Sequence, residues 1–199
     1  MKLERIGKQV IVRPYKKSDY QAWKTAYLSI LPKQKNAWDI TAQRDESKLK
    51  RSDFEKILAS QKMNRNDDYF FDFGIFLKDG TLIGGVSIMD ISRQVFQNAY
   101  LGYRIFNNYW GKGYGKEGVR LGIDIAFKDL KLHRIEAGIE PNNRRSLNLA
   151  KSLKMRREGV KKRALFLRNK WVDLVMYTLT SEDVGRKFNT NSLVLKRRM

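Results

Sequence analysis

The stretch YWGKGYGKEG, residues Tyr109 to Gly118, is the most informative part of this sequence. Gly111, Gly113 and Gly115 stand at every second position, and a helix is predicted directly after them. A fixed glycine costs about 0.5–1 kcal/mol relative to alanine, so this concentration indicates a backbone that another group approaches closely. Unpaired amide N–H groups ahead of a helix favour an anion, and the stretch therefore predicts a phosphate-binding loop.

The spacing excludes two better-known glycine loops. A nucleotide-binding P-loop needs a lysine followed by a hydroxyl residue directly after its last glycine, and this pair is missing here, because Glu117 follows Lys116. The dinucleotide pattern GxGxxG does not fit either, because Gly118 falls too late. A structural glycine turn without any ligand remains an alternative at this point.

Composition limits the fold and the chemistry. A chain of 199 residues with 42% hydrophobic content is long enough for one well-buried core, so a single domain is expected. The absence of cysteine excludes disulfides and thiol nucleophiles, and a single histidine excludes a histidine-built metal cage. No metal site is expected. The N-terminus lacks a signal-peptide pattern and no run is long enough to span a bilayer, which predicts a soluble, cytoplasmic protein.

The formal net charge of +20 calls for a partner or an explanation. Between residues 144 and 170 eleven basic side chains face a single acidic one, Glu158, and Lys196, Arg197 and Arg198 lie near the end of the chain. Such a field attracts polyanions, including nucleic acid, the ribosome or a phosphate-rich cofactor. A solvated basic surface that only aids solubility is the equal alternative.

The hydrophobic patterns predict a mixed α/β structure. Strands are expected at residues 9–13, 69–77, 81–89, 99–106, 134–139, 164–167 and 171–179, with a tight turn at Lys78 to Gly80. Helices are expected at residues 18–30, from 47 or 52 to 63, at 116–130 and at 146–155, and MNRNDD is expected to be a polar loop.

Three separate segments carry a resemblance to a known family. The segments YLGYRIFNNYWGKGYGKEGVRLGIDIAF, LHRIEAGIEPNNRRSLNLAKSLKMRREG and NKWVDLVMYTLTSED occur in the right order. They resemble the GCN5-related N-acetyltransferases (GNAT), in particular the RimJ/RimL-type branch that acetylates N-terminal amines of ribosomal proteins. The resemblance implies a GNAT domain over residues 1–184, followed by a basic tail at 185–199. It also implies one mixed, mostly antiparallel sheet of about seven strands, with helices on both faces and strand 99–106 splayed from strand 134–139.

The resemblance implies acetyl-CoA as co-substrate and assigns residues to it. The pantetheine arm would insert between the splayed strands and bond to backbone groups of Tyr103, Arg104 and Ile105. The phosphate loop would be Trp110, Gly111, Lys112, Gly113, Tyr114 and Gly115, with Lys116 adding charge. Trp110 departs from the general Arg or Gln at that position but is similar to the tryptophan of this branch, so the phosphate contacts would come mainly from N–H groups.

Two further residues match the family's PENxxS signature. Asn143 would orient the pantetheine or a bound water, and Ser146 would lie near the sulfur. When an amine attacks a thioester, an oxyanion forms, and a backbone N–H would stabilise it. The thiolate then departs, and Ser146 would supply a proton to it. Ser146 is also a good helix cap, and Asn143 a good turn residue, so purely structural roles stay open.

The general base is the least defined part of the site. Relatives often carry a glutamate before the Gly-Tyr pair, where this chain has Tyr100. Asp90 and Glu140 are alternatives by location, and a water relay is another. An N-terminal amine, with a pKa of about 7.7–8, needs only modest help to lose its proton.

A second departure concerns a helix end. The family has a glycine in the left-handed conformation where this chain has Lys154, and lysine would pay about 1 kcal/mol for that geometry.

The sequence therefore predicts an N-acetyltransferase that transfers acetyl to a primary amine by direct attack, with a protein N-terminus favoured and a monomer or homodimer expected. One alternative is a small-molecule acetyltransferase acting on polyamines or antibiotics. The other is a catalytically weak, basic RNA- or ribosome-binding protein on the same fold. Acetyl-CoA should raise the melting temperature of an enzyme, whereas an RNA binder should respond to polyanions and salt.

Overall fold

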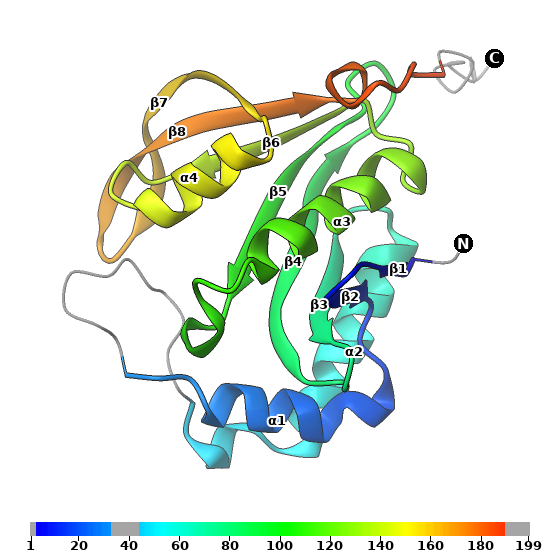
Figure 1. Cartoon of the computed structure of the whole chain (residues 1–199), viewed down its shortest axis with the longest axis vertical. Coiled ribbons are helices and arrows are strands. Elements are labelled where there is room, and N and C mark those ends of the chain that lie inside the picture. Colours follow the sequence, from blue (N-terminus) through cyan, green and yellow to red (C-terminus); the bar gives the residue numbers. More distant parts are fainter. Residues whose placement is uncertain (1–2, 33–43, 190–199) are drawn as a thin grey trace.

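The computed structural model describes residues 3–32 and 44–189, which form one continuous β-sheet with helices packed on it (Figure 1). The described sheet has eight strands in the order β1-β2-β3-β4-β5-β6-β8-β7. About seven strands were expected; the additional one is β1, a two-residue strand that pairs with β2 and is too short to give a hydrophobic pattern.

The strand bounds follow the predicted hydrophobic segments, with one large exception. The strands are β1 (Arg5–Ile6), β2 (Val10–Arg13), β3 (Phe71–Leu77), β4 (Leu82–Ser92), β5 (Asn98–Ile105), β6 (Arg134–Ile139), β7 (Arg156–Leu167) and β8 (Lys170–Thr180). All neighbouring strands are antiparallel except β5 and β6, which are parallel. The predicted turn between β3 and β4 is confirmed, with Gly80 at φ 89°.

The exception is β7, which was expected to begin at residue 164 and begins at Arg156. Its side chains are exposed along nearly the whole strand, so neither face shows the apolar alternation by which a strand is recognised. Two register shifts against β8 disturb the period further. The β7–β8 turn has positive φ at Arg168 (51°) and Asn169 (59°), as a two-residue hairpin turn requires.

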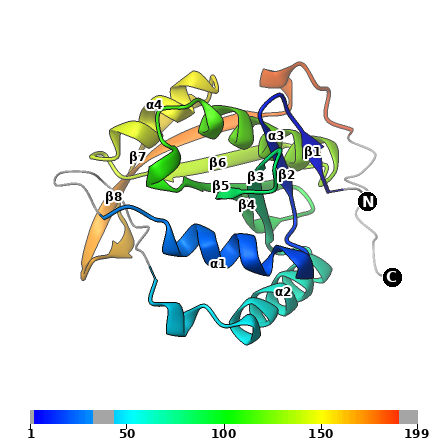
Figure 2. The same ribbon diagram turned by 60° about the horizontal axis from the view of Figure 1, so that its bottom comes forward.

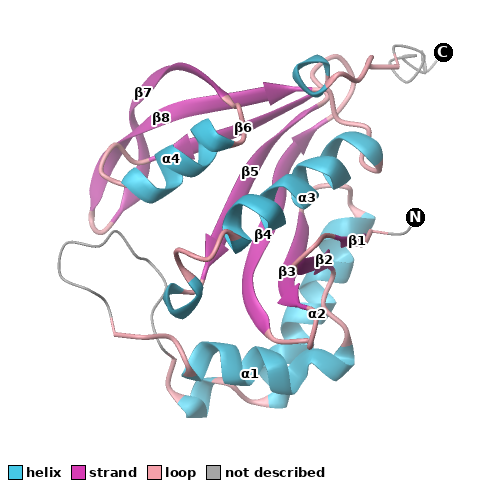
Figure 3. Cartoon of the chain, in the orientation of Figure 1, coloured by secondary structure: helices cyan, strands magenta, loops and turns pink. Residues whose placement is uncertain are grey.

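Within the described residues four α-helices cover the sheet, and Figure 2 shows it between α3 and α4 on one face and α1 and α2 on the other. They are α1 (Tyr20–Leu28), α2 (Arg51–Asn66), α3 (Tyr114–Lys128) and α4 (Arg144–Ser152), and Figure 3 distinguishes them from the strands by colour. Helices on both faces are thus confirmed. The polar loop expected at MNRNDD was wrong for the first four of its six residues, because α2 continues to Asn66.

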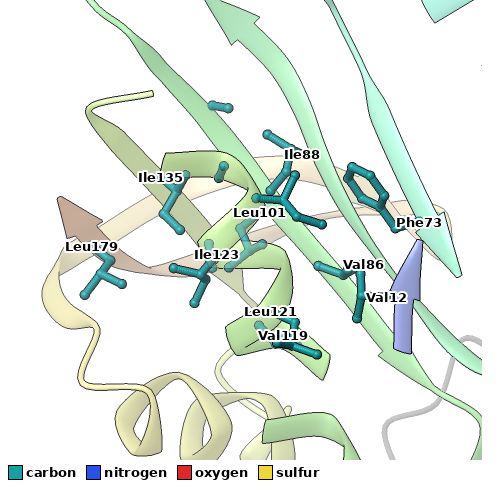
Figure 4. Close-up of a cluster of buried hydrophobic side chains, with 14 of the residues drawn as sticks. Val12, Phe73, Val86, Ile88, Leu101, Val119, Leu121, Ile123, Ile135 and Leu179 are labelled. Carbon is teal, nitrogen blue, oxygen red and sulfur yellow. The ribbon is translucent and has the colours of Figure 1, made fainter. Parts of the chain in front are cut away.

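Strand alternation divides the apolar side chains between the two faces of the sheet. Val10 and Val12 of β2 join the larger cluster beneath α3, part of which Figure 4 shows, whereas Ile11 packs against the cluster beneath α1 and α2. Gly118 of α3 allows the helix to approach the sheet, because a Cβ there would lie 2.8 Å from Cδ1 of Ile75. The larger cluster therefore fixes the position of α3 and of the loop before it.

The expected splay between two central strands is confirmed and lies between β5 and β6. These strands pair over only three residues, from Asn98 with Arg134 to Tyr100 with Glu136. Beyond that point they diverge, and the β6 side of β5 is left without a strand partner (Figure 1). The divergence begins directly after Tyr100, so the residues of β5 from Leu101 onward border the gap between the two strands.

The helix end at Lys154 adopts the geometry expected from the sequence. Lys154 has φ 62°, and the N–H of Met155 donates to the carbonyl of Ala150 (3.1 Å), which closes the end of α4. A lysine in this conformation costs about 1 kcal/mol that glycine would not pay.

All described strands belong to one sheet, and the larger apolar cluster spans from β2 to β8. Of the tail expected at 185–199, residues 190–199 lie outside the described part of the chain. Within the described residues no helix is both long and apolar enough to cross a bilayer.

Candidate functional site

A cavity of about 630 Å³ occupies the splay between β5 and β6. It is bordered by the N-terminal ends of α3 and α4 and by leucines of the β7–β8 hairpin. Ten of the twelve predicted site residues line it, namely Tyr103, Arg104, Ile105, Trp110, Gly111, Gly113, Tyr114, Gly115, Asn143 and Ser146. Lys112 and Lys116 do not line it, and Nζ of Lys112 instead lies 5.7 Å from the centre of the Tyr109 ring.

The cavity is lined by consecutive residues of β5, whose side chains point alternately to the two faces of the sheet. Leu101, Tyr103 and Ile105 of β5 pack with the cluster beneath α3, whereas the side chain of Arg104 points to the opposite face and bonds to the hydroxyl of Tyr27 on α1. Gly102, between them, also lines the cavity. The unpaired edge of β5 is therefore part of the cavity wall.

The glycine loop presents a run of free donors. In the described part of the chain, the backbone N–H groups of residues 111–115 form no hydrogen bond, and helix α3 starts at Tyr114. Gly111 and Gly113 have φ of 78° and 80°, and a Cβ on either would project into open space. Glycine is thus required for backbone conformation, and the donors, reinforced by the helix dipole, fit a diphosphate.

Gly115 is needed for a different reason. It lies inside α3, where a Cβ would come within 3.3 Å of Cγ1 of Ile105. The absence of a side chain lets the helix start close to β5 and so brings the donors to the edge of the splay.

Trp110 is held in place and in turn carries a cation. Its indole Nε1 donates to the carbonyl oxygen of Ile105 (2.7 Å), which engages one of the two lone pairs of that oxygen. The guanidinium carbon of Arg145 lies 4.0 Å from the centre of the Trp110 ring, and Arg145 lines the cavity. Arg145 was not predicted as a site residue. Its only signal in the sequence was membership of a basic run next to PNN.

Two hydroxyl groups meet at the wall of the cavity. Oγ of Ser146 donates to the Tyr103 hydroxyl (2.8 Å), which donates in turn to the backbone carbonyl of Ser146 (3.2 Å). Burial raises the pKa of Tyr103 to about 12, partly offset by the hydrogen bond from Ser146. Tyr103 therefore stays protonated at neutral pH and can donate. The pairing joins β5 to α4, and it was not predicted, because Tyr103 had been assigned only a backbone role.

The cap of α4 is Asn143, so the interpretation of Ser146 as a helix cap was wrong. Oδ1 of Asn143 accepts from the backbone N–H of Ser146 (3.1 Å), and Ser146 is the third residue of the helix. Asn143 thereby orients the first turn of α4, which carries both Arg145 and Ser146 into the cavity.

The structure separates the candidates for the general base. Asp90 accepts from the Tyr69 hydroxyl (2.6 Å) and does not line the cavity. Glu140 lines the cavity but is ion-paired with Arg168. Tyr100 stands where the splay begins, and its hydroxyl accepts from Nζ of Lys161 (2.9 Å). No candidate combines an unengaged carboxylate with a position in the cavity wall.

A metal site is not formed by the residues described. In residues 3–32 and 44–189, no group of three or more His, Asp or Glu side chains is placed to hold an ion. The donors around the cavity are amides, hydroxyls and guanidinium groups, which suit phosphate and carbonyl oxygen.

Comparison with known proteins identifies most of the chain as an acetyltransferase domain. Residues 9–156 match the family model described as an acetyltransferase (GNAT) domain. The probable N-acetyltransferase YjcK of Bacillus subtilis is 36% identical over 124 residues, covering 62% of this chain and 67% of that protein. The ribosomal protein uS5-alanine N-acetyltransferase of Escherichia coli is 32% identical over 141 residues, covering 70% and 73%.

Solved structures are similar over almost the whole chain. Mycobacterium smegmatis RimJ in complex with CoA-disulfide has a TM-score of 0.75 at 25% identity, covering 93% of this chain and 88% of that one. A spermidine N-acetyltransferase SpeG chimera from Vibrio cholerae and hSSAT has a TM-score of 0.67 at 17% identity, covering 90% and 100%. The second likeness concerns the fold alone.

Proposed function

Because the chain belongs to the GNAT family and is an acetyl-CoA-dependent N-acetyltransferase, we propose that its acceptor is the N-terminal amine of a protein, with ribosomal proteins favoured. When bound, acetyl-CoA supplies an activated acetyl thioester. The residues of this chain bind its phosphates, orient the thioester in the splay and admit the amine from the other face of the sheet. The observation that supports this assignment is that the glycine loop, the hydroxyl pair and consecutive residues of β5 line one cavity.

The charges around the cavity support a neutral amine in preference to a polycation. Among the described residues that line the cavity, Glu140 is the only carboxylate, and it is ion-paired with Arg168. A polyamine carries several positive charges and needs opposed carboxylates, whereas an N-terminal amine is substantially neutral near pH 8. The absence of a free carboxylate in this part of the wall therefore favours a peptide acceptor.

The exposed strand β7 supports an acceptor on or near the ribosome. Arg157, Arg163 and Lys170 lie on the β7–β8 hairpin and form no ion pair within the described part of the chain. The hairpin also borders the cavity through Leu165 and Leu167. A polyanion held by these cations would lie next to the place where the acceptor enters.

A panel of amines tests the acceptor. We expect peptides with N-terminal alanine or serine to release free thiol from acetyl-CoA faster than spermidine or aminoglycosides at equal concentration. Mass spectrometry of the products locates the added acetyl group, and an N-terminally blocked peptide with an internal lysine is the control. Turnover of polyamines alone would refute the peptide assignment and leave the acetyltransferase activity in place.

The hydroxyl pair is assigned to the departing sulfur. Negative charge grows on the sulfur as the thioester bond breaks, and a hydroxyl that donates a hydrogen bond to it lowers the barrier. We expect Ser146→Ala to lower kcat about 10²-fold, with a much smaller change in KM for acetyl-CoA. Tyr103→Phe should have a similar effect, and the double variant should be little worse than either one, because the two groups act as a unit.

Ser152→Ala is the matched control for this experiment. Ser152 is an exposed serine on the same helix, its Oγ donates to the carbonyl of Leu149 (2.8 Å), and it does not line the cavity. Its kcat should stay within about twofold of the unmodified enzyme. A full rate for Ser146→Ala would remove the hydroxyl pair from the mechanism.

A further inference from the structure

The guanidinium of Arg145 stacks on the indole ring of Trp110 at the wall of the cavity. Trp110 is fixed by its hydrogen bond to the carbonyl of Ile105 (2.7 Å), and the guanidinium carbon of Arg145 lies 4.0 Å from its ring centre. A cation over an indole face is held by electrostatic attraction, which leaves the N–H groups at the edge of the guanidinium free to donate. The stack therefore places an arginine while keeping its donors available.

Those donors have no partner within the described residues. Arg145 forms no ion pair or hydrogen bond there, whereas three other arginines near the β7–β8 hairpin, Arg134, Arg156 and Arg168, are each paired with a carboxylate. Arg145 also lines the same cavity as Gly111 and Gly113, whose amides are unpaired as well. An unpaired cation thus adjoins a row of unpaired N–H groups.

We propose that Arg145 binds a phosphate group of CoA and that Trp110 holds Arg145 in position for this contact. The inference rests on the proposed function, in which the cavity binds the coenzyme. A guanidinium matches a phosphate with two parallel hydrogen bonds, which a lysine cannot reproduce. The amides of residues 111–115 contribute from the loop and the first turn of α3, and Arg145 contributes from α4, so the phosphates are held by elements that precede and follow β6 in the chain. Arg145 is a binding residue in this role and takes no part in the acyl transfer.

Calorimetric titration with CoA, a ligand that undergoes no turnover, tests the proposal on the full chain. We expect Arg145→Gln to raise the Kd for CoA at least about tenfold, since hydrogen bonds between charged groups are strong. Arg145→Lys should recover only part of the affinity. Arg144→Gln is the control: it removes the same charge from the neighbouring position of α4, it does not line the cavity, and its Kd should stay within about twofold.

Two further ligands locate the contact. Acetylpantetheine lacks the ADP half, and its Kd should be the same for Arg145→Gln and the unmodified protein. A loss seen with CoA but not with 3′-dephospho-CoA assigns Arg145 to the 3′-phosphate, and an equal loss with both assigns it to the diphosphate.

Three results overturn the inference. They are an unchanged Kd for CoA in Arg145→Gln, an equal loss in Arg144→Gln, and a parallel loss for acetylpantetheine, which would indicate a distorted cavity. An unmodified protein that does not bind CoA would overturn the proposed function itself, and with it this inference.

Discussion

Gly113→Val is expected to abolish the thermal stabilisation that acetyl-CoA gives the unmodified protein. At a coenzyme concentration 100-fold above Kd, binding stabilises the folded state by about 2.7 kcal/mol. For a chain of this size that corresponds to a rise in Tm of about 5–10 °C. Gly113 has φ 80° and an open space where a Cβ would be, so valine strains the loop and places methyl groups where the phosphates should lie.

Gly185→Val is the control for backbone strain. Gly185 also has a positive φ (72°) and open space around its Cβ position, but it follows the last described 3-10 helix, Glu182–Val184, and does not line the cavity. Both variants should lose some stability without ligand, and only Gly185→Val should keep the full response to acetyl-CoA. A thermal scan with and without coenzyme measures both quantities. If Gly113→Val kept its response, the loop would not be the phosphate site.

Asp19→Ala is expected to lower the free energy of unfolding by about 3–5 kcal/mol. The Asp19 carboxylate accepts from both terminal nitrogens of Arg13 (2.6 and 2.8 Å) and from the backbone N–H of Lys16 (2.7 Å). The two side chains are only 13% and 9% exposed, and the Arg13 guanidinium lies 3.9 Å from the centre of the Phe76 ring. Removing the carboxylate leaves a buried cation without its partner, which is the costly way to break such a pair.

Urea denaturation measures this loss, and Asp124→Ala serves as the control. Asp124 forms an i,i+4 pair with Lys128 on α3, with both side chains 36% exposed, so its removal should cost no more than about 0.5 kcal/mol. Replacing both buried partners, as Arg13→Met with Asp19→Leu, should recover much of the loss. A cost below about 1 kcal/mol for Asp19→Ala would show that water reaches Arg13 freely. The site is affected indirectly, since Asp19 immediately precedes α1 and Tyr27 of α1 bonds to Arg104.

Local patterns were sufficient for most of the elements. The strands of the core alternate apolar and polar residues, and helix α3 has an apolar stripe, because one side of each is buried. The predicted bounds were wrong for elements in which no single side is buried. β7 is exposed on both faces, β1 has only two residues, and the last turn of α2 is polar, so nothing in the sequence marked their true bounds.

For the candidate site, the sequence likewise predicted contacts between neighbouring residues and missed contacts between distant ones. Residues adjacent in the chain could be placed together from the sequence, as with the loop from Trp110 to Gly115. The contact between Tyr103 and Ser146 joins residues 43 positions apart, and the stack of Arg145 on Trp110 joins α4 to the loop before α3. Neither could be read from spacing, because each depends on how α4 is set against β5.

The motifs and their order along the chain determined the family, its fold and its coenzyme. These motifs could be read from the sequence because a glycine turn or a helix start depends mainly on residues that are close in the chain. Tertiary packing alone decided that Lys112 and Lys116 fall outside the cavity, that Asn143 rather than Ser146 caps α4, and that Arg145 enters the site. The physical reason is that the direction of a side chain is set by the helix phase and strand register that bury the most apolar surface, and these are properties of the whole sheet.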